Sequence, residues 1–506
     1  MSRTIRLEEL LRDIPGAGVD GDAGAAVRDV VLDSRRASPG ALFAALPGEK
    51  TDGARFIGAA IAAGASVVLA DPACAAAARA AGAAPKAWVT TGEPRRTLGL
   101  IARNFHGRPD EHLALAGITG TNGKTSVAWL VAEILGEAGR PAGLVGTVEY
   151  RTGSRRIAAE RTTPDAVELW RLLAEMRDAG CRAAVLEVSS HSLALDRVAG
   201  LSFDAAVFTN LTHDHLDFHK TMDAYADAKR LLFSRHLRAD GMAIAGRDDE
   251  RAAYMLAGAP AGARRATFGF APGSDLRIEA TRCGLTGTDL RLCLPGGDRI
   301  QARAPLPGRP GALNIAAGIL TAAGLGVDPL RAAEIAARFG GAPGRFERVD
   351  RGQEFAVIVD YAHTDDALRN LLESVREMAP RRVITVFGCG GDKDRTKRAP
   401  MGIAAMRFSD LVFLTSDNPR GEDPEAILQD AEVGLRSVPG SSGRYRLLPD
   451  RREAITAAIA SAEPGDAVVI AGKGHETVQV LRDRTIPFDD RIVARDALAI
   501  RTGRAA

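Results

Sequence analysis

Short apolar runs alternate with amphipathic segments along almost the whole chain. The runs are too apolar for strands that face water, whereas the segments between them repeat their apolar residues at helical spacing. This alternation predicts an α/β protein with mostly parallel sheets and helices on both faces. The expected strands cover residues 66–70, 113–118, 183–188, 205–209, 355–359, 383–387, 411–415 and 467–471.

Two breaks in the alternation indicate three domains. A chain of 506 residues exceeds what one core serves, and about 100–200 residues per domain gives about three domains. Gly-Arg-Pro-Asp at 107–110 and Gly-Gly-Ala-Pro-Gly at 340–344 interrupt the pattern. We therefore expect an N-terminal domain over 1–108, a central P-loop-type domain over 109–341 and a C-terminal Rossmann-like α/β domain over 342–506.

Composition excludes several classes of protein. The net charge of +2 provides no basic field for nucleic acid, and the five scattered cysteines lack metal-ligand spacing and fit a reducing cytoplasm. The charged N-terminus lacks the apolar core of a signal peptide, and the longest apolar stretch, residues 58–84, is broken by Gly64 and Pro72. We expect a cytoplasmic monomer that acts on small molecules, without nucleic-acid binding or membrane insertion.

A glycine-rich segment follows the strand expected over 113–118. It reads Gly120, Thr121, Asn122, Gly123, Lys124, Thr125, Ser126, and an apolar-periodic helix comes next. In this context backbone N–H groups face an anion, Lys124 reaches the β- and γ-phosphates of ATP, and Thr125 can ligate Mg²⁺. The spacing departs from the common phosphate loop, because Ile118 stands where a glycine is usual. The alternative is a glycine turn that binds nothing.

Polar residues gather at the ends of the next two expected strands. Glu187 closes one strand, and residues 213–219, which include His213, His215 and His219 with two aspartates, follow the other. Ligands bind at the carboxyl ends of parallel strands, so Glu187 and His215 are placed to hold a cation beside the phosphate loop, although Mg²⁺ prefers oxygen ligands. A lone histidine would be structural, but this crowding favours a polar site. Lys229, taken alone, would be a solvated surface lysine.

These motifs resemble those of the Mur ligase family. The segment 119–126 is similar to that family's variant phosphate loop, which accounts for the displaced glycine, and residues 187–191 and 209–219 are similar to its next two blocks. The resemblance implies an ATP-dependent amide ligase that forms an acyl phosphate and uses Mg²⁺. It also implies that Lys229 is N-carbamoylated by CO₂, which a neutral amine can capture and a guanidinium cannot. The implied catalytic residues are Lys124, Glu187, His215 and Lys229, and the implied metal ligands are Thr125, Glu187, His215 and the carbamate of Lys229.

Further positions match the family's substrate contacts. Ser34, Thr162, Thr163, Ser189 and Arg197, with Lys229, resemble residues that hold a UDP-linked muramoyl dipeptide. Asn314, Arg345, Asp360 and His363 resemble contacts to ATP outside the loop. Singly, Ser34 or Thr162 would be a turn or a helix cap. We also expect the C-terminal domain to close on the central one when ATP binds.

Two strand ends in the C-terminal part are expected to select the incoming amino acid. Asp417, Asn418, Pro419 and Arg420 follow one strand, and Gly472 and Glu476 follow another. Arg420 offers a planar fork for a distal carboxylate, and Glu476 a counter-charge for an ammonium group. This pattern resembles the family member that adds meso-2,6-diaminopimelate as the third amino acid of the peptidoglycan stem.

Three positions depart from the family pattern. Lys393 stands where a second donor-binding arginine is usual, so the charge is kept but the fork is lost. Asp365 replaces a proline and Ala317 replaces an asparagine. We expect neither Asp365 nor Ala317 to inactivate the protein, because the phosphate loop, Glu187, His215 and Lys229 all match, whereas Lys393 bears on selectivity for the donor.

Three alternatives stay open. One is the L-lysine-adding homologue, which does not need Arg420. Another is folylpolyglutamate synthetase, whose family lacks the N-terminal domain with Asp33-Ser34-Arg35 and the motif at 417–420. The last is a non-catalytic nucleotide-binding module, which ATP hydrolysis independent of any amino acid would favour.

Overall fold

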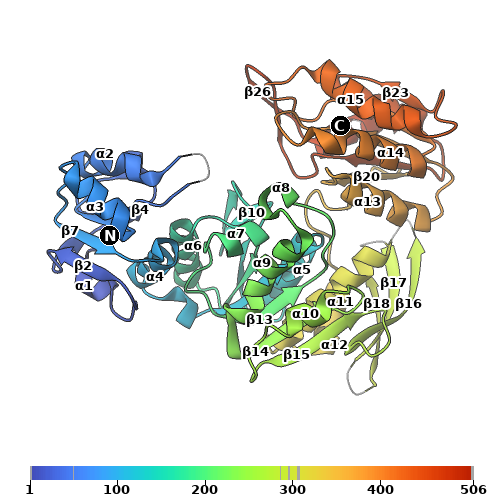
Figure 1. Ribbon diagram of the computed structural model, residues 1–506. Helices are drawn as coiled ribbons and strands as arrows, with labels where there is room; N and C mark the ends of the chain where they lie inside the picture. The colour runs from blue at the N-terminus through green and yellow to red at the C-terminus, as the bar shows by residue number, and fades with distance from the viewer. Residues whose placement is uncertain (1–2, 49–50, 285–286, 295–296, 305–307, 503–506) are drawn as a thin grey trace.

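The computed structural model describes residues 3–48, 51–284, 287–294, 297–304 and 308–502. Three large sheets follow one another along this part of the chain. Figure 1 shows them as three bodies, with the central one joined to the N-terminal part (blue) at one end and to the C-terminal part (orange and red) at the other. The predicted α/β class with mostly parallel sheets is confirmed. The boundaries inferred at 108/109 and 341/342 stay predictions.

The N-terminal sheet has five strands in the order β2-β7-β6-β5-β4, parallel except for β2. Apolar side chains fill both faces: Leu98 and Ile101 of α4 lie on one, and Ile57 and Ala60 of α2 on the other. A short ribbon of β1 and β3 adjoins it. The elements are β1 (Ile5–Arg6), α1 (Leu7–Leu10), β2 (Gly18–Gly21), β3 (Ala26–Val27), β4 (Asp29–Val31), β5 (Ala41–Ala44), α2 (Ile57–Ala62), β6 (Val67–Ala70), α3 (Pro72–Ala80), β7 (Ala87–Thr90) and α4 (Pro94–Phe105).

The central sheet has eleven strands in the order β11-β10-β9-β12-β8-β13-β14-β15-β16-β17-β18. Neighbours from β9 to β16 pair in parallel, and antiparallel hairpins extend both edges. The strands are β8 (Ala114–Thr119), β9 (Ala142–Val145), β10 (Glu149–Thr152), β11 (Arg155–Ala158), β12 (Ala183–Glu187), β13 (Phe203–Phe208), β14 (Leu237–Gly246), β15 (Arg264–Gly269), β16 (Leu276–Gly284), β17 (Gly287–Cys293) and β18 (Arg299–Ala304).

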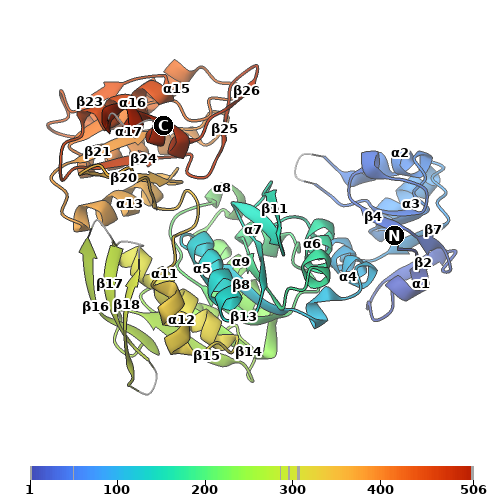
Figure 2. The same ribbon diagram turned by 180° about the vertical axis from the view of Figure 1, so that it is seen from behind.

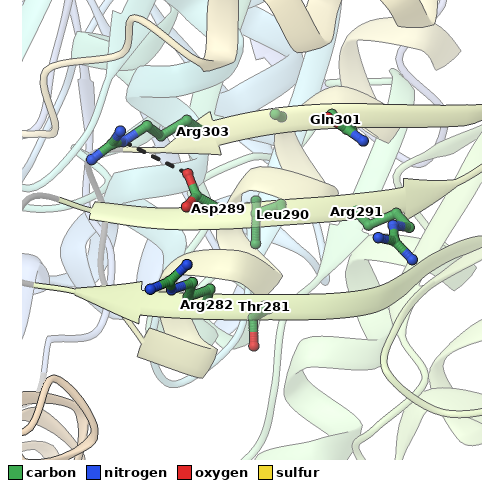
Figure 3. Close-up of a pocket in the computed structure, with 8 residues that line it drawn as sticks. Thr281, Arg282, Asp289, Leu290, Arg291, Gln301 and Arg303 are labelled. Atoms are coloured by element: carbon green, nitrogen blue, oxygen red, sulfur yellow. Dashed lines mark ion pairs between the residues drawn. The ribbon is translucent and has the colours of Figure 1, made fainter.

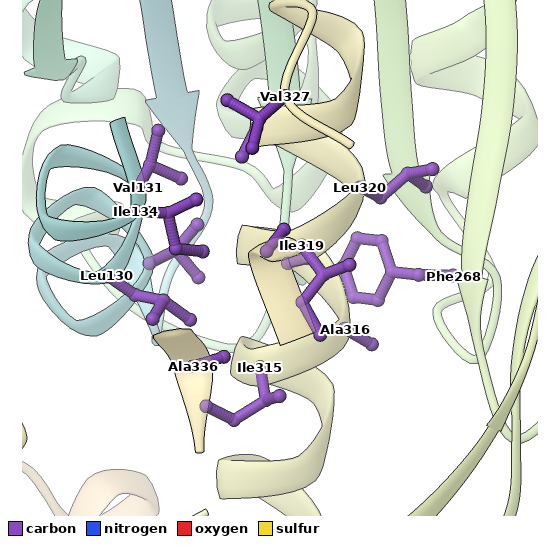
Figure 4. Packing of buried hydrophobic residues seen from close by; sticks show 14 of the residues in the cluster. Leu130, Val131, Ile134, Phe268, Ile315, Ala316, Ile319, Leu320, Val327 and Ala336 are labelled. Carbon is purple, nitrogen blue, oxygen red and sulfur yellow. The ribbon is translucent and has the colours of Figure 1, made fainter. Parts of the chain in front are cut away.

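Helices cover both faces of the central sheet. Figure 2 shows α5, α11 and α12 on one face, where Ile315 and Ile319 of α11 pack between Leu130 and Ile134 of α5 and Phe268 of β15 (Figure 4). The core of the other face includes Trp170 of α6. These helices are α5 (Lys124–Glu137), α6 (Ala166–Asp178), α7 (Ser190–Ala194), α8 (Leu216–His219), α9 (Met222–Ser234), α10 (Ala252–Leu256), α11 (Gly308–Gly324) and α12 (Pro329–Ala336).

The C-terminal sheet has six strands in the order β19-β20-β24-β21-β22-β23, parallel except for β19. Helices α13, α14 and α15 pack on one face, and α16 and α17 on the other. The elements are β19 (Glu347–Arg348), β20 (Ala356–Asp360), α13 (Asp365–Glu377), β21 (Val383–Phe387), α14 (Arg398–Phe408), β22 (Leu411–Leu414), α15 (Pro424–Ser437), β23 (Tyr445–Leu447), α16 (Arg451–Ser461), β24 (Ala467–Ala471), β25 (Val478–Val480), β26 (Thr485–Pro487) and α17 (Asp490–Thr502).

The segment that enters the C-terminal domain crosses the loop after β24 with backbone against backbone. Gly344 and Gly474 both have positive φ, at +65° and +52°. A Cβ on Gly344 would collide with the backbone of His475, and a Cβ on Gly474 would lie 2.6 Å from the carbonyl oxygen of Gly344. Only glycine therefore fits at this crossing.

Membrane insertion was not expected, and none of the helices in the described ranges combines the length and the apolar character that a bilayer span requires.

Candidate active site

The phosphate loop is the turn between β8 and α5. Gly120 and Gly123 have φ values of +145° and +86°, and a Cβ at either would collide with Thr209 Oγ1 or Asn314 Oδ1, respectively. Asn210 fixes the turn, since its side-chain oxygen accepts from the N–H of Asn122 at 3.0 Å. The predicted strand–loop–helix order is present, and the loop packs against both β13 and α11.

Lys124 and Lys229 converge on this loop. Their amines donate to the same carbonyl oxygen, that of Gly120, at 2.9 and 2.8 Å. Lys229 is 1% exposed and lies 4.3 Å from the centre of the Tyr225 ring, so the surface location considered for it from sequence alone is wrong. Burial, and then the charge of Lys124, holds the pKa of Lys229 well below its usual value.

Glu187 is the hub of a second group of contacts. Its side chain is buried at the end of β12 and accepts from the Thr125 hydroxyl at 2.9 Å. Thr147, which follows β9, donates its backbone N–H and its hydroxyl to the two oxygens of the same carboxylate, at 2.8 and 3.0 Å. The phosphate loop and two neighbouring strand ends thus meet at one carboxylate.

The residues expected to hold the muramoyl peptide adjoin this hub. Thr162 Oγ1 lies 3.1 Å from Thr147 Oγ1, and Thr163 donates to the backbone oxygen of Glu187 at 2.7 Å. Ser189 caps α7 and donates its N–H to Thr163, while Arg197 donates to the backbone of Thr163. Ser34 lies apart from them, at the start of a short 3-10 helix in the N-terminal domain.

His215 precedes α8 in a left-handed backbone conformation. Burial lowers the pKa of its imidazole to about 4, so the ring is neutral at pH 7 and has a lone pair to offer. It packs edge-on against His191, with ring centres 4.8 Å apart, and its ring centre lies 6.1 Å from that of Tyr225. Within the described residues, no three His, Cys, Asp or Glu side chains gather closely enough to form a metal site.

The other expected ATP contacts lie between the central and C-terminal domains. The Asn314 side chain faces Gly123. The guanidinium of Arg345 stacks over Tyr361 at 4.6 Å, and its buried Nε has no hydrogen-bond partner among the described residues. Asp360 accepts from two backbone N–H groups, and burial raises its pKa.

Two loops at the carboxyl ends of β22 and β24 carry the expected donor-binding residues. Lys473, which is fully buried, donates to Asn418 Oδ1 at 3.0 Å and to Glu476 Oε2 at 2.8 Å. Burial alone would raise the pKa of Glu476, but Lys473 and Asn418 lower it. Arg420 donates Nη1 to the backbone oxygens of Gly391 and Asn418. The two loops are therefore joined by one hydrogen-bond network.

A polar cavity of about 520 Å³ separates the central and C-terminal domains. Its central wall comprises residues 213–217 and its C-terminal wall includes both donor loops. Eight of the residues predicted from sequence line it: His215, His363, Lys393, Asp417, Asn418, Arg420, Gly472 and Glu476. Another hollow, of about 500 Å³, lies over β16–β18 among Arg282, Arg291 and Arg303 and contains none of the predicted residues (Figure 3).

The three departures have different surroundings. Lys393 is exposed in the cavity wall near Arg420. Asp365 is the first residue of α13, a position that suits an acidic side chain as well as a proline. Ala317 is buried in the apolar core of α11, where it makes no polar side-chain contact.

Sequence reasoning missed three residues of this site. Thr147 binds Glu187, Asn210 fixes the phosphate loop, and the Tyr225 hydroxyl lies 3.2 Å from Thr121 Oγ1. Thr147 and Asn210 each follow a parallel strand, so a search of every strand end would have found both. Tyr225 lies one helical turn before Lys229, and only the burial of that lysine draws attention to it.

The central sheet carries the phosphate loop, and residues 213–217 of the same part of the chain face a second α/β domain across a polar cavity. This arrangement is typical of a nucleotide-dependent ligase built from three domains. Three family models match the chain: "Mur ligase family, catalytic domain" at 27–106, "Mur ligase middle domain" at 118–322 and "Mur ligase, glutamate ligase domain" at 344–474. The chain belongs to the Mur ligase family.

Its relatives match it over almost the full length. A UDP-N-acetylmuramoyl-L-alanyl-D-glutamate–2,6-diaminopimelate ligase of Solibacter usitatus is 46% identical, with 93% of each chain covered. The ligase of the same name from Streptomyces coelicolor is 43% identical over 97% of this chain and 96% of its own. A solved structure of a ligase with this name has a TM-score of 0.71 and 32% identity, covering 99% of this chain and 100% of its own.

Proposed function

We propose that this chain joins an amine of meso-2,6-diaminopimelate to the D-glutamyl carboxylate of UDP-N-acetylmuramoyl-L-Ala-D-Glu, with ATP as the energy source. The observation that carries the proposal is the cavity between the domains, where His215 faces Arg420 and Glu476 from the opposite wall. The phosphate loop and the names of the full-length relatives support it. Because both the nucleotide-linked acceptor and ATP are cytoplasmic metabolites, we place the reaction in the cytoplasm.

The chemistry requires activation of the acceptor. A free carboxylate does not acylate an amine, because oxide is a poor leaving group. The carboxylate oxygen attacks the γ-phosphorus of ATP, which releases ADP and leaves an acyl phosphate. The amine then attacks the carbonyl carbon, loses a proton and expels phosphate as the amide forms. Lys124, at the start of α5, is the cation nearest to the expected phosphates, and Arg345 would supply a second cation from the side of the C-terminal domain.

The residues around Glu187 fit Mg²⁺. The Glu187 carboxylate and the Thr125 hydroxyl are hard oxygen donors that already lie 2.9 Å apart. His215, whose ring lies against His191, would add a nitrogen donor. Bound Mg²⁺ would neutralise charge on the phosphoryl oxygens. Lys229 supplies a further oxygen donor once its neutral amine adds to CO₂, a step that forms one C–N bond, releases one proton and leaves a carbamate.

Recognition of the acceptor is divided between two domains. Ser34 would contact the uridine end, and Thr162, Thr163, Ser189 and Arg197 the muramoyl peptide. The hydrogen bond from Thr163 to Glu187, the one from the Thr147 hydroxyl to Glu187 and the contact between the Thr147 and Thr162 hydroxyls support this assignment, because they join the expected peptide contacts to the expected metal ligand Glu187.

Recognition of the donor falls to the two loops in the other wall. Arg420 would bind the distal carboxylate, with Lys393 as a second cation, and Asp417, Asn418 and Glu476 would surround the distal ammonium. Pro419 and Gly472 shape these loops: a Cβ on Gly472 would lie 2.9 Å from Asp417 Oδ2. An L-lysine-adding enzyme has no distal carboxylate for Arg420, and the five-stranded N-terminal sheet disfavours folylpolyglutamate synthetase.

The test is ligation by the purified protein with ATP, Mg²⁺ and the UDP-linked dipeptide, with meso-diaminopimelate and L-lysine offered side by side. We expect the diaminopimelyl tripeptide and one ADP per amide, with no product from Lys124→Ala. A preference for L-lysine would overturn the donor assignment. ADP release without any new amide would overturn the ligase assignment and favour the nucleotide-binding module.

A further inference from the structure

Arg451 is the first residue of α16, and its guanidinium is completely buried beneath the donor loops. It forms a bidentate ion pair with Asp490 at the start of α17, in which Nε donates to Oδ1 at 2.8 Å and Nη2 donates to Oδ2 at 2.6 Å. The other N–H groups of the guanidinium face the sheet. Nη2 donates to the backbone oxygen of Ala471 at 2.9 Å, and Nη1 donates to that of Ser416 at 3.4 Å.

Those two carbonyl groups stand at the roots of the two donor loops. Ser416 directly precedes Asp417–Arg420, and Ala471 directly precedes Gly472–Glu476. The strands β22 and β24 are not neighbours, because β21 lies between them. One rigid, planar guanidinium therefore joins the roots of two loops that the sheet's own hydrogen bonds do not join, in addition to the hydrogen bonds of Asn418 with Lys473 and Glu476.

The Arg451–Asp490 ion pair is better suited to orienting the two loops than to raising the stability of the fold. Burying two charges costs about as much as their attraction returns, so a buried pair adds little stability over apolar residues of the same volume. The pair instead fixes orientation. Asp490 orients the guanidinium of Arg451, and the guanidinium orients the two carbonyl groups. A shift of either loop would reach the donor-binding side chains, because Lys473 and Asn418 link the loops to Glu476.

We propose that Arg451, oriented by Asp490, is a positioning residue for donor selection, which sets the distance between Arg420 and Glu476 and thereby favours an amino acid with a distal carboxylate and ammonium group. The inference rests on the proposed function of the two loops. Arg451 touches no reacting atom in this scheme. It acts through the loops.

The test compares two variants with a control. Arg451→Lys keeps the charge but loses the fork, and the double variant Arg451→Met/Asp490→Leu removes both buried charges, so that none is left unpaired. The control is Asp466→Asn, which weakens the contacts of Arg381 and Arg382 at the opposite end of β24. Thermal unfolding and circular dichroism verify the fold of each protein.

We expect both Arg451 variants to raise KM for meso-diaminopimelate by about tenfold and to narrow its preference over L-lysine, because small displacements of binding groups are costly. The KM values for ATP and for the UDP-linked dipeptide should stay within about twofold of wild type, as should all constants of Asp466→Asn. An unchanged donor KM in a folded Arg451 variant, or an equal rise in the control, would overturn the proposal. If the double variant does not fold, Arg451→Lys decides alone.

Hydrogen–deuterium exchange on the ligand-free proteins separates this inference from the proposed function. Faster exchange in peptides that cover 416–420 and 472–476, in the Arg451 variants but not in the control, would show the positioning effect even if the wild-type protein used a different donor. Unchanged exchange in both loops would contradict it even if the wild-type protein ligates meso-diaminopimelate.

Discussion

Lys124 and Lys229 donate to one carbonyl oxygen, that of Gly120, at 2.9 and 2.8 Å. Two ammonium groups so close together in a buried site repel each other, and burial disfavours the charged form of each. The pKa of Lys229 is accordingly held well below its usual value, first by burial and then by Lys124. Burial and the charge of Lys124 therefore both favour the neutral form of the Lys229 amine, which is the form that adds to CO₂.

Replacing Lys229 with arginine should abolish this chemistry, because a guanidinium does not capture CO₂. We expect Lys229→Arg to lose ligation by at least about 100-fold, since a ligand to the expected metal is lost. Carbon-13 NMR in labelled bicarbonate should show a carbamate resonance in the wild type and not in the variant. Lys220→Arg, at an exposed lysine just after α8, should retain both the resonance and the activity. Equal resonances in wild type and Lys229→Arg would place the carbamate elsewhere.

Alanine should have different effects at two glycines, one at the N-cap of α5 and one within the helix. Gly123→Ala puts a Cβ against Asn314 at a positive φ and should weaken ATP binding by about tenfold or more, measured by calorimetric titration. Gly136, in the same helix, has open space around its Cβ position. Gly136→Ala should therefore raise the free energy of unfolding by about 0.5–1 kcal/mol without affecting ATP binding. Normal ATP affinity in Gly123→Ala would contradict the packing described for the loop.

Donor selectivity should depend on the shape of the cation at two positions. Arg420→Lys loses the planar fork and should raise KM for meso-diaminopimelate by about tenfold, with little effect on the KM for ATP. Lys393→Arg restores a fork to the same cavity wall and should lower that KM. Competition between meso-diaminopimelate and L-lysine measures both effects. A selectivity that neither substitution alters would show that the donor binds elsewhere.

Thr147 should matter for turnover although it does not reach the cavity between the domains. Thr147→Val keeps the volume but removes the hydroxyl that contacts Glu187 and Thr162. We expect kcat to fall by about tenfold through loss of carboxylate orientation, whereas Thr147→Ser should remain close to wild type. Steady-state kinetics over a range of Mg²⁺ concentrations would show whether metal affinity falls in parallel. A fully active Thr147→Val would exclude the role.

Acid should destabilise the fold through His236. Burial lowers the pKa of its imidazole to about 4 from an ordinary value of 6.5, so the unfolded chain takes up a proton well before the folded one. Stability is therefore lost as pH falls from about 6.5 towards 4, and this residue accounts for about 2 kcal/mol of the loss by about pH 5. Urea unfolding at pH 7.5 and 5 should show a smaller loss for His236→Gln, and the exposed His112→Gln should behave as wild type.

The sequence predicts the bounds of a strand most accurately where a continuous apolar run is buried on both faces of a sheet. The strands at 383–387 and 467–471 have the predicted bounds, because continuous apolar runs identify strands buried on both faces. The phosphate loop and Glu187 lie at the carboxyl ends of such strands, and Thr125 and Glu187 are in contact there, whereas the roles assigned to them and to His215 stay predictions.

The rest depends on contacts that a local pattern does not contain. Edge strands such as β11 and β18 carry arginine on an exposed face, so a search for apolar runs passes over them. The burial of Lys229 depends on the packing of α9 under the loop, and the link from Thr147 to Glu187 depends on β9 pairing with β12. Pairing order is a property of the fold, which local spacing does not determine.

The glycine crossing has a mechanical consequence. With Gly344 locked against Gly474, the entering segment cannot slide over the loop that carries Glu476. If the two large domains swing together around bound nucleotide, the pivot must lie upstream of Gly344, and everything beyond it turns as a single lever. The loop that carries Glu476 would then keep its position relative to the entering segment throughout such a movement.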